Sequence, residues 1–229
     1  MGHFELGAIV SALPYLLKTG LTFTLTLTAL SAVMGIALGT LLAMLRLSPL
    51  KLLAWPAAIY VNVMRSVPLL LVIFWFYFLV PYMGAWVLGQ PRPVQVGAFN
   101  SAVITFTLFE SAYFCEIVRA GIQSVPKGQV AAALALGMQP GQVMRSVVLP
   151  QAFRNMTPAI LTRIIMLFQD TSLVYVLSLT DFLGAASKIG QRDGRLVEMY
   201  MFVALVYLVI CFAASRGTAL LARRNRYQR

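Results

Sequence analysis

Long apolar segments alternate with short polar stretches along the whole chain. Five of these segments are long enough to cross a bilayer as helices, which takes about 20 apolar residues for each crossing. Their expected bounds are 20–44, 52–82, 98–122, 156–179 and 197–221. The pattern predicts an all-α integral membrane protein with about five transmembrane helices. The first ~15 residues are expected to form a separate short helix at the membrane surface.

The second apolar segment, 52–82, is too long for one straight span. Arg65 and Ser66 interrupt it and Pro68 follows, which removes a backbone donor and clashes with the preceding helical turn. We therefore expect a broken or strongly kinked helix, followed by a loop over 81–97. In the first span, Gly35 and Gly39 form a small-xxx-small pair that allows another helix to approach closely.

Composition supports a membrane protein and argues against other classes. The chain is 60% hydrophobic and 11% charged, with a mean hydropathy of +0.82, whereas a soluble domain has about a quarter of its residues charged. Two cysteines in apolar segments, Cys115 and Cys211, suggest neither a disulfide framework nor a metal site. The single histidine, His3, offers no nucleophile pair. We expect no catalytic residue, and a membrane-embedded enzyme using Glu110, Glu116 or Asp170 is disfavoured.

The net charge of +11 does not point to nucleic acid, because the basic residues cluster at the ends of the spans. With five spans, one side holds only basic residues: Arg46, Lys51, Lys127, Arg145, Arg154, Arg223, Arg224, Arg226 and Arg229. The other side mixes both signs: Lys18, Arg92, Lys188, Arg192 and Arg195 with Glu5, Asp181, Asp193 and Glu198. The excess of Lys and Arg in cytoplasmic loops then predicts a periplasmic N-terminus and a cytoplasmic C-terminus.

A polar, basic loop at 123–155 separates the third and fourth spans. It contains the sequence AAALALG, a run of strong helix formers closed by a glycine. We expect a short rigid helix, a tight turn at the glycine and a stop at the later proline. The candidate docking residues of this loop are Ala131, Ala132, Ala133, Leu134, Gly137, Leu149 and Pro150.

Ionisable residues within spans are costly to insert and are candidates for function. Here they are Arg65, Glu110, Glu116, Arg119, Arg163 and Asp170. Glu116 and Arg119 are three residues apart, which favours a structural ion pair. Arg163 and Asp170 are seven apart and share a helix face, and Arg163 is interpreted as structural. For Glu110, a polar path and an inter-helix hydrogen bond both remain open.

A cluster of hydrogen-bonding residues lies near the middle of the fourth span: Gln169, Asp170, Thr171 and Ser172. With Arg65, Ser66 and Pro68 of the interrupted second span, and with Glu110, they form a candidate substrate path. A zwitterionic amino acid needs an acceptor for its ammonium group and donors for its carboxylate, which Asp170 and Arg65 supply. In the alternative, Arg65 and Asp170 neutralise each other and bind nothing.

The loop resembles the coupling loop of ABC importer permeases, A-A-x-x-x-G, nine residues, an aliphatic residue, any residue and Leu-Pro. One departure is that the glutamate that begins the family's motif falls on Ala131. The likeness covers nearly the whole chain and is specific in VNVMRSVPLLLVIFWFY, ESAYFCEIVRAGIQSVPKGQ, LPQAFRNMTP and LFQDTSLVYVLSLTDF. These segments are similar to the polar amino acid uptake branch. FQDTSLVYVLSLTDF and IGQRDG are most similar to glutamate/aspartate importer permeases.

The resemblance implies a type I ABC importer (MetI-like) permease fold in a bacterial inner membrane. It implies a cytoplasmic ATPase dimer that holds ATP and Mg²⁺, a second permease subunit alongside, and a periplasmic amino-acid-binding protein. The chain itself has no phosphate-binding G-x-x-x-x-G-K-[ST] motif and is expected to bind no cofactor. A basic or neutral amino acid as substrate stays open, as does the identity of the second permease. A stand-alone secondary transporter or channel is disfavoured, because no inverted repeat is apparent.

Overall fold

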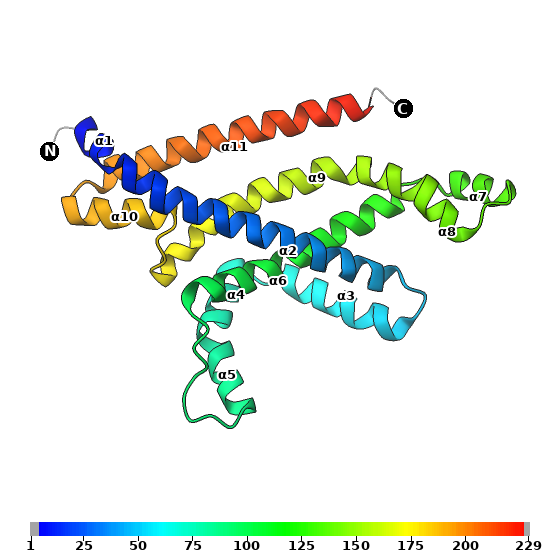
Figure 1. Ribbon diagram of the computed structural model, residues 1–229, viewed down its shortest axis with the longest axis horizontal. Coiled ribbons are helices and arrows are strands. Elements are labelled where there is room, and N and C mark those ends of the chain that lie inside the picture. The colour runs from blue at the N-terminus through cyan, green and yellow to red at the C-terminus, as the bar shows by residue number, and fades with distance from the viewer. Residues whose placement is uncertain (1–4, 227–229) are drawn as a thin grey trace.

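A computed structural model of the chain describes residues 5–226, and every regular element in that range is helical. The helices form an elongated bundle in which α2, α6, α9 and α11 run along the long axis (Figure 1). The bounds are α1 Leu6–Tyr15, α2 Thr22–Leu47, α3 Lys51–Ser66, α4 Leu69–Phe74, α5 Val80–Val87, α6 Ala98–Gln123, α7 Lys127–Ala135, α8 Pro140–Val143, α9 Leu149–Asp170, α10 Phe182–Asp193 and α11 Leu196–Arg226. His3 and Arg229 lie outside the described residues, as do the side chains of Arg224 and Arg226.

The first span is longer than expected. A π-helical turn, Leu16–Leu21, joins α1 to α2 without a break, so Gly7–Leu47 is one apolar helix of 41 residues. The prediction of a separate surface helix before a span at 20–44 is therefore wrong. Pro14 lies inside α1 and does not end it. The helix continues directly into the π-helical segment Leu16–Leu21.

The second apolar segment is interrupted where the arginine and proline lie. Helix α3 ends at Ser66, and Val67 and Pro68 have extended backbones before α4 begins at Leu69. The carbonyl oxygen of Pro68 accepts the backbone N–H groups of the first turn of α4. Part of the expected loop at 81–97 is helical instead, because α5 continues to Val87. Helix α5 projects away from the bundle as an arm (Figure 1).

Helices α2 and α6 pack closely because α2 has glycine at the contact. A Cβ atom placed on Gly39 would lie 2.7 Å from the Cβ of Phe114 and 2.8 Å from the carbonyl oxygen of Ser111. On Gly35 it would lie 3.2 Å from the Cβ of Glu110. The expected close approach at the glycine pair is confirmed, and α6 is the helix that approaches.

The fourth span starts earlier than expected. Helix α8, a π-helical segment Met144–Val148, α9 and a 3-10 segment Thr171–Leu177 follow one another directly, so Pro140–Leu177 is one long apolar helix. About half of the expected loop at 123–155 therefore belongs to this helix. Five helices of the described chain are long and apolar enough to cross a membrane, which agrees with the expected number.

Helix α10 lies between the expected fourth and fifth spans, 156–179 and 197–221, where no helix was predicted. The carboxylate of Asp181 caps it by accepting the backbone N–H groups of Leu183 and Gly184 at 3.0 and 2.9 Å. Burial raises the pKa of Asp181 to about 6, although both backbone donors and Lys188 oppose this shift. Phe182 and other apolar residues of α10 pack against α11 in a core that α1 shares.

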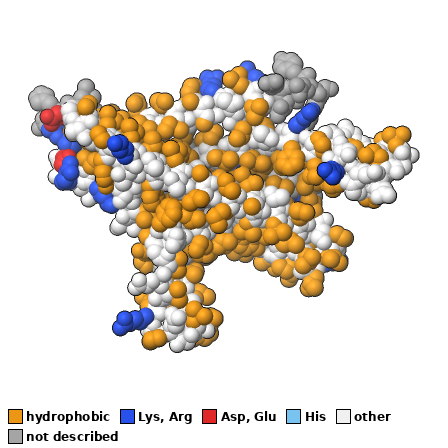
Figure 2. Space-filling view, viewed as in Figure 1, with side chains coloured by type: hydrophobic (Ala, Val, Ile, Leu, Met, Phe, Trp, Pro, Cys, Tyr) orange, Lys and Arg blue, Asp and Glu red, His pale blue; other side chains and the backbone are white. Residues whose placement is uncertain are grey.

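The two ends of the bundle differ in what they carry. The segment α7–α8, the α2–α3 turn and the C-terminal end of α11 lie at one end, and α1 with α10 lies at the other (Figure 1). The space-filling view shows a broad apolar belt between charged side chains near the ends (Figure 2). The structure therefore groups the basic turn, the loop and the tail at one end of the molecule, as the charge pattern predicts.

Candidate functional site: a docking loop and two charged clusters

Helix α7 ends in a tight turn built on Gly137. The φ angle of Gly137 is +81°, in the left-handed region that favours glycine. Its N–H donates to the carbonyl of Leu134 at 3.0 Å, and the N–H of Met138 donates to that of Ala133 at 3.2 Å. These two bonds are the pair that defines a Schellman helix end. The chain therefore reverses at a fixed point, which sets the direction in which α7 is presented.

One face of α7 is buried and the other is open. Ala133 packs into a small apolar core of this end of the molecule. Ala131, Ala132 and Leu134 are exposed, and Leu136 beyond them is 84% exposed. The core is made by Val125, Ala133, Val143, Val148 and Ala152. Because the loop has its own core, α7 is held as a rigid element with an apolar outer face.

Side-chain hydrogen bonds attach α7 and the end of α6 to α9. The amide of Gln151 donates to the side-chain oxygen of Gln129 at 2.6 Å, and that of Asn155 donates to the hydroxyl of Ser124 at 2.7 Å. A hollow of about 630 Å³ lies between α6, α7 and α8 and is lined mostly by apolar residues. Leu134 lines this hollow while remaining partly exposed.

Leu149 and Pro150 begin α9, directly after the π-helical segment Met144–Val148. The prediction that Pro150 stops a helix is wrong. The helix continues through Pro150. The π-helical segment before it changes the backbone hydrogen-bond spacing at the point where proline lacks an N–H group. Leu149 and Pro150 thus belong to the base of the loop, whereas Ala131 to Gly137 form its tip.

Glu110 lies at the centre of the first charged cluster. Its side chain is 0% exposed and accepts two bonds from Arg163 of α9, from Nε at 2.7 Å and from Nη2 at 2.5 Å. Arg163 also lies 3.4 Å from Asp170 on the same face of α9 and 4.0 Å above the ring of Tyr113. Of the two interpretations left open for Glu110, the structure has the inter-helix contact. Two carboxylates share one guanidinium, so the cluster has a net charge of −1.

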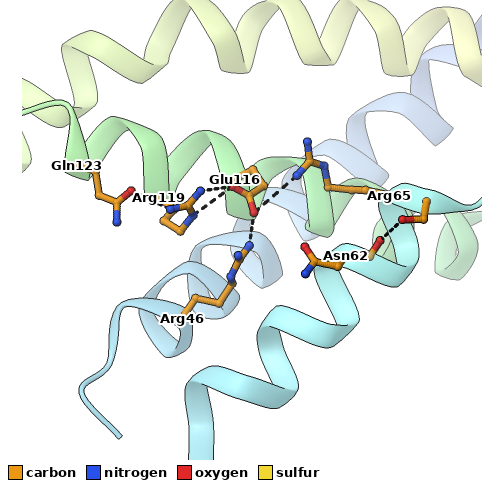
Figure 3. Close-up of polar contacts among 7 residues, drawn as sticks. Arg46, Asn62, Arg65, Glu116, Arg119 and Gln123 are labelled. Carbon is orange, nitrogen blue, oxygen red and sulfur yellow. Dashed lines mark hydrogen bonds and ion pairs between the residues drawn. The ribbon is translucent and has the colours of Figure 1, made fainter. Parts of the chain in front are cut away.

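Glu116 lies at the centre of the second cluster, with guanidinium groups around it from three helices (Figure 3). Arg46 of α2 pairs with it, Arg119 of α6 donates to it at 2.7 Å, and Arg65 of α3 is 3.6 Å away. The expected pair between Glu116 and Arg119 is confirmed, but it is one contact of three. Since one carboxylate faces three arginines, this cluster has a net charge of +2.

Arg65 and Asp170 do not pair with each other. The ion pair of Arg65 is with Glu116 and that of Asp170 is with Arg163, so the alternative of mutual neutralisation is not what the structure has. Arg65 remains 41% exposed, with its guanidinium 5.5 Å from the ring of Tyr113. Tyr113 therefore lies between the two clusters, with Arg65 near it in one and Arg163 near it in the other.

An open hollow of about 350 Å³ is lined by Asn62, Arg65, Ser66 and Tyr113. The hydroxyl of Ser66 donates to the carbonyl of Asn62 at 2.7 Å, within α3. The hollow lies at the C-terminal end of α3, just before the break at Pro68. The C-terminal end of α3, the partly exposed guanidinium of Arg65 and the polar side chains of Asn62 and Ser66 therefore adjoin one hollow.

The polar run at the end of α9 points in several directions. Gln169 is exposed and Ser172 is half-buried. Thr171 is buried, and its hydroxyl donates to the carbonyl of Phe168 at 2.7 Å. The structure brings Asp170 and Glu110 together through Arg163, but it turns Thr171 into the bundle. Four consecutive polar residues therefore do not form one polar face.

A family model matches residues 35–227 and is described as "Binding-protein-dependent transport system inner membrane component". This match covers well over half of the chain. The chain belongs to this family. It is therefore a multi-pass inner membrane transport component, and the transmembrane helices described above are those of a permease.

Relatives of known name extend over nearly the same length as the chain. It is 52% identical to the glutamate/aspartate import permease protein GltK of Escherichia coli, covering 98% of the chain and 100% of that protein. It is 34% identical to the arginine transport system permease protein ArtQ of Bacillus subtilis, covering 91% of each. A crystal structure of an amino acid ABC transporter with histidines aligns with a TM-score of 0.87, at 32% identity, covering 98% of the chain and 99% of that structure. This alignment supports the type I permease fold.

Two residues of this permease matter at the charged clusters and were not among the sequence candidates. Arg46 was interpreted only as part of a basic turn, yet it contacts Glu116. Tyr113 was not singled out in the sequence, yet its ring faces both Arg65 and Arg163. Both contacts join different helices, so no spacing within one helix signals them.

Proposed function

We propose that this permease carries glutamate and aspartate from the periplasm to the cytoplasm as part of an ATP-driven ABC importer. The chain is the permease component of an ABC amino acid importer. The proposal of an acidic substrate is supported by the 52% identity to a glutamate/aspartate import permease over nearly the full length. Identity to the arginine permease is 34%. Permeases for basic or neutral amino acids are the alternative that the experiments below exclude or establish.

In this proposal the outer face of α7 docks on a separate ATPase subunit, and ATP and Mg²⁺ bind there. Ala131, Ala132 and Leu134 are exposed and apolar, which suits a helix that enters a cleft. The internal core and the Gly137 turn hold α7 rigid, so a displacement of the ATPase is transmitted to α9 through the bonds of Gln151 and Asn155. With alanine at position 131, docking relies on apolar contact and not on a carboxylate.

The proposed substrate path runs along the hollow beside Tyr113. Arg65 supplies a partly exposed guanidinium for a carboxylate of the substrate, next to Ser66 and the break at Pro68. Asp170 is the acceptor for the ammonium group, because its side chain is 34% exposed whereas that of Glu110 is enclosed by Arg163. A substrate with two carboxylates and one ammonium group is then attracted by the net charge of +2 around Glu116.

We place the end of the bundle that carries α7 in the cytoplasm, with the N-terminus in the periplasm. The basic residues of the α2–α3 turn, of the docking loop and of Arg223 gather at this end, which is the distribution found on the cytoplasmic side. The proposed partners are an ATPase dimer, a second permease subunit and a periplasmic amino-acid-binding protein. The exposed arm of α5 and the apolar belt leave room for a second permease and for lipid.

Uptake of labelled glutamate by cells that produce the complete transporter tests the substrate. Excess unlabelled aspartate should abolish the signal, and excess arginine or glutamine should leave it unchanged. Inhibition by arginine alone would contradict the proposal and favour a permease for basic amino acids.

The Asp170→Asn variant tests the path in the same assay. Glutamate uptake should fall at least tenfold while binding of the ATPase is retained, because the shape stays and only the charge is lost. Arg192→Gln, at an exposed ion pair of α10, is the control for general loss of charge. Normal uptake by Asp170→Asn would remove this residue from the path.

A further inference from the structure

A second hollow, of about 290 Å³, opens where α2 ends, α3 begins and α6 nears its C-terminus. Arg46, Lys51 and Arg119 line it together with Trp55 and Gln123. The α2–α3 turn, whose flanking residues Arg46 and Lys51 line the hollow, lies at the same end of the bundle as α7 and α8 (Figure 1). The hollow of the proposed substrate path opens at the other end of α3, beside Arg65, and shares no lining residue with this one.

The hollow is strongly basic. None of the residues that line it is acidic. The carboxylate nearest to it is that of Glu116, which Arg46, Arg65 and Arg119 already surround (Figure 3). Arg119 also donates to the side-chain oxygen of Gln123 at 2.8 Å, which holds its guanidinium in place at the rim. Three cations of the described chain line this hollow, Arg46, Lys51 and Arg119, and Glu116 is the one carboxylate that pairs with two of them, so an anion is favoured here.

The first turn of α3 adds backbone donors to these cations. Helix α3 has 16 residues, and Lys51 is its first residue. No side chain caps its N-terminal N–H groups, since Leu50 stands at the N-cap position. A helix N-terminus without a cap favours a negative group, and phosphate oxygens are typical acceptors there. The basic side chains and the helix end thus point to the same chemistry.

Exposed apolar side chains lie in the same stretch of chain as Lys51 and Trp55, which line the hollow. Leu52 is 85% exposed and Trp55 is 72% exposed, and Leu50 and Leu53 are exposed beside them. The α2–α3 turn follows the end of the apolar helix Gly7–Leu47, and tryptophan is enriched where such spans meet the lipid headgroups. A free phosphate ion makes no apolar contacts with such a surface. A phospholipid can place its phosphate in the hollow and its acyl chains against these residues.

We propose that this hollow binds the phosphate headgroup of an anionic phospholipid in the leaflet on the docking-loop side. Basic pockets between transmembrane helices on the cytoplasmic side are suited to such headgroups. Arg46, Lys51 and Arg119 hold the phosphate, and Trp55 lies along the chains. The bound lipid shields three like charges from one another at the junction of α2, α3 and α6.

Native mass spectrometry of the full-length permease in detergent tests this proposal. The protein is incubated with equal amounts of phosphatidylglycerol and phosphatidylcholine, and the ratio of the two retained lipids is measured. Wild-type protein should retain phosphatidylglycerol preferentially. Lys51→Gln should lower the ratio about fivefold, the loss expected for one basic residue beside an anionic lipid, while Lys51→Arg should preserve it.

Lys18→Gln is the matched control, because Lys18 is an exposed lysine at the other end of the same bundle. This variant should keep the wild-type ratio. An equal drop in both glutamine variants would show a non-specific effect of charge and overturn the proposal. Equal retention of the two lipids by wild-type protein would also overturn it. Full displacement of phosphatidylglycerol by millimolar inorganic phosphate would assign the hollow to a free anion instead.

Discussion

Replacing Glu110 by glutamine should strongly destabilise this permease. The side chain is fully buried and accepts two charge-assisted bonds from Arg163. Glutamine keeps the size of the side chain but offers one oxygen and no charge. The guanidinium of Arg163 is then left in the bundle with Asp170, at 3.4 Å, as its remaining anionic contact.

The expected size follows from what happens when one partner of a buried ion pair is removed. Such a change costs about 3–5 kcal/mol, because the remaining charge stays buried without compensation. Arg163 is only 13% exposed, so water cannot replace the lost carboxylate. Since Asp170 still faces it, the cost should lie at the lower end, about 3 kcal/mol.

Stability is measured in detergent as the temperature at which half of the protein no longer elutes as a single species after heating. Glu110→Gln should lower this temperature clearly, and Arg192→Gln, at an exposed pair, should leave it unchanged. The double variant Glu110→Gln with Arg163→Met should recover a large part of the loss, because no uncompensated charge remains. If Glu110→Gln proves as stable as Arg192→Gln, the buried pair does not support the bundle as argued here.

Three further predictions concern single residues. Gly137→Ala should reduce uptake while membrane insertion persists, because placing a residue with a Cβ atom in the left-handed turn costs about 1–2 kcal/mol. The control is Gly141→Ala, which has open space and no positive φ and should transport normally. Gly39→Ala should destabilise the α2–α6 contact by about 1–3 kcal/mol, and Gly217→Ala, with no atom near the added group, should not; equal melting of the two would contradict the packing. The pKa of Asp181 is raised to about 6, so the folded state holds its proton more tightly than the unfolded chain, and stability from this residue should fall as pH rises from about 4 to about 6. Asp181→Asn should remove this dependence, and an unchanged pH profile would show that another group causes it.

Much of the fold follows from sequence because the bilayer constrains it. Apolar length identifies the spans, and the number of five agrees with the structure. The glycine pair at Gly35 and Gly39 identifies a close helix contact because nothing larger fits there. The break at Pro68 follows from a missing donor. Each of these features depends on local chemistry that a single segment contains.

The sequence-based predictions were wrong at helix ends, where a helix continued further than expected, and for ion pairs between residues far apart in the chain. The first ~15 residues were expected to form a separate helix, yet the π-helical segment Leu16–Leu21 joins them to α2. Pro150 was expected to end a helix, yet the π-helical segment Met144–Val148 leads directly into α9. Helix α10 contains Lys188, Arg192 and Asp193 and is too short and too charged to register as a span, so apolar length did not reveal it. The partners of Arg65 and Glu110 lie on other helices, and charge alone did not decide among several acids and arginines.

Uptake by proteoliposomes that contain the complete transporter tests the central claim most directly. ATP is enclosed inside the vesicles, and labelled glutamate is added outside together with the periplasmic binding protein. We predict accumulation of glutamate that requires hydrolysable ATP, competes with aspartate and is lost in the Gly137→Asp permease. Accumulation without ATP, or with arginine and not glutamate as the transported amino acid, would contradict the account.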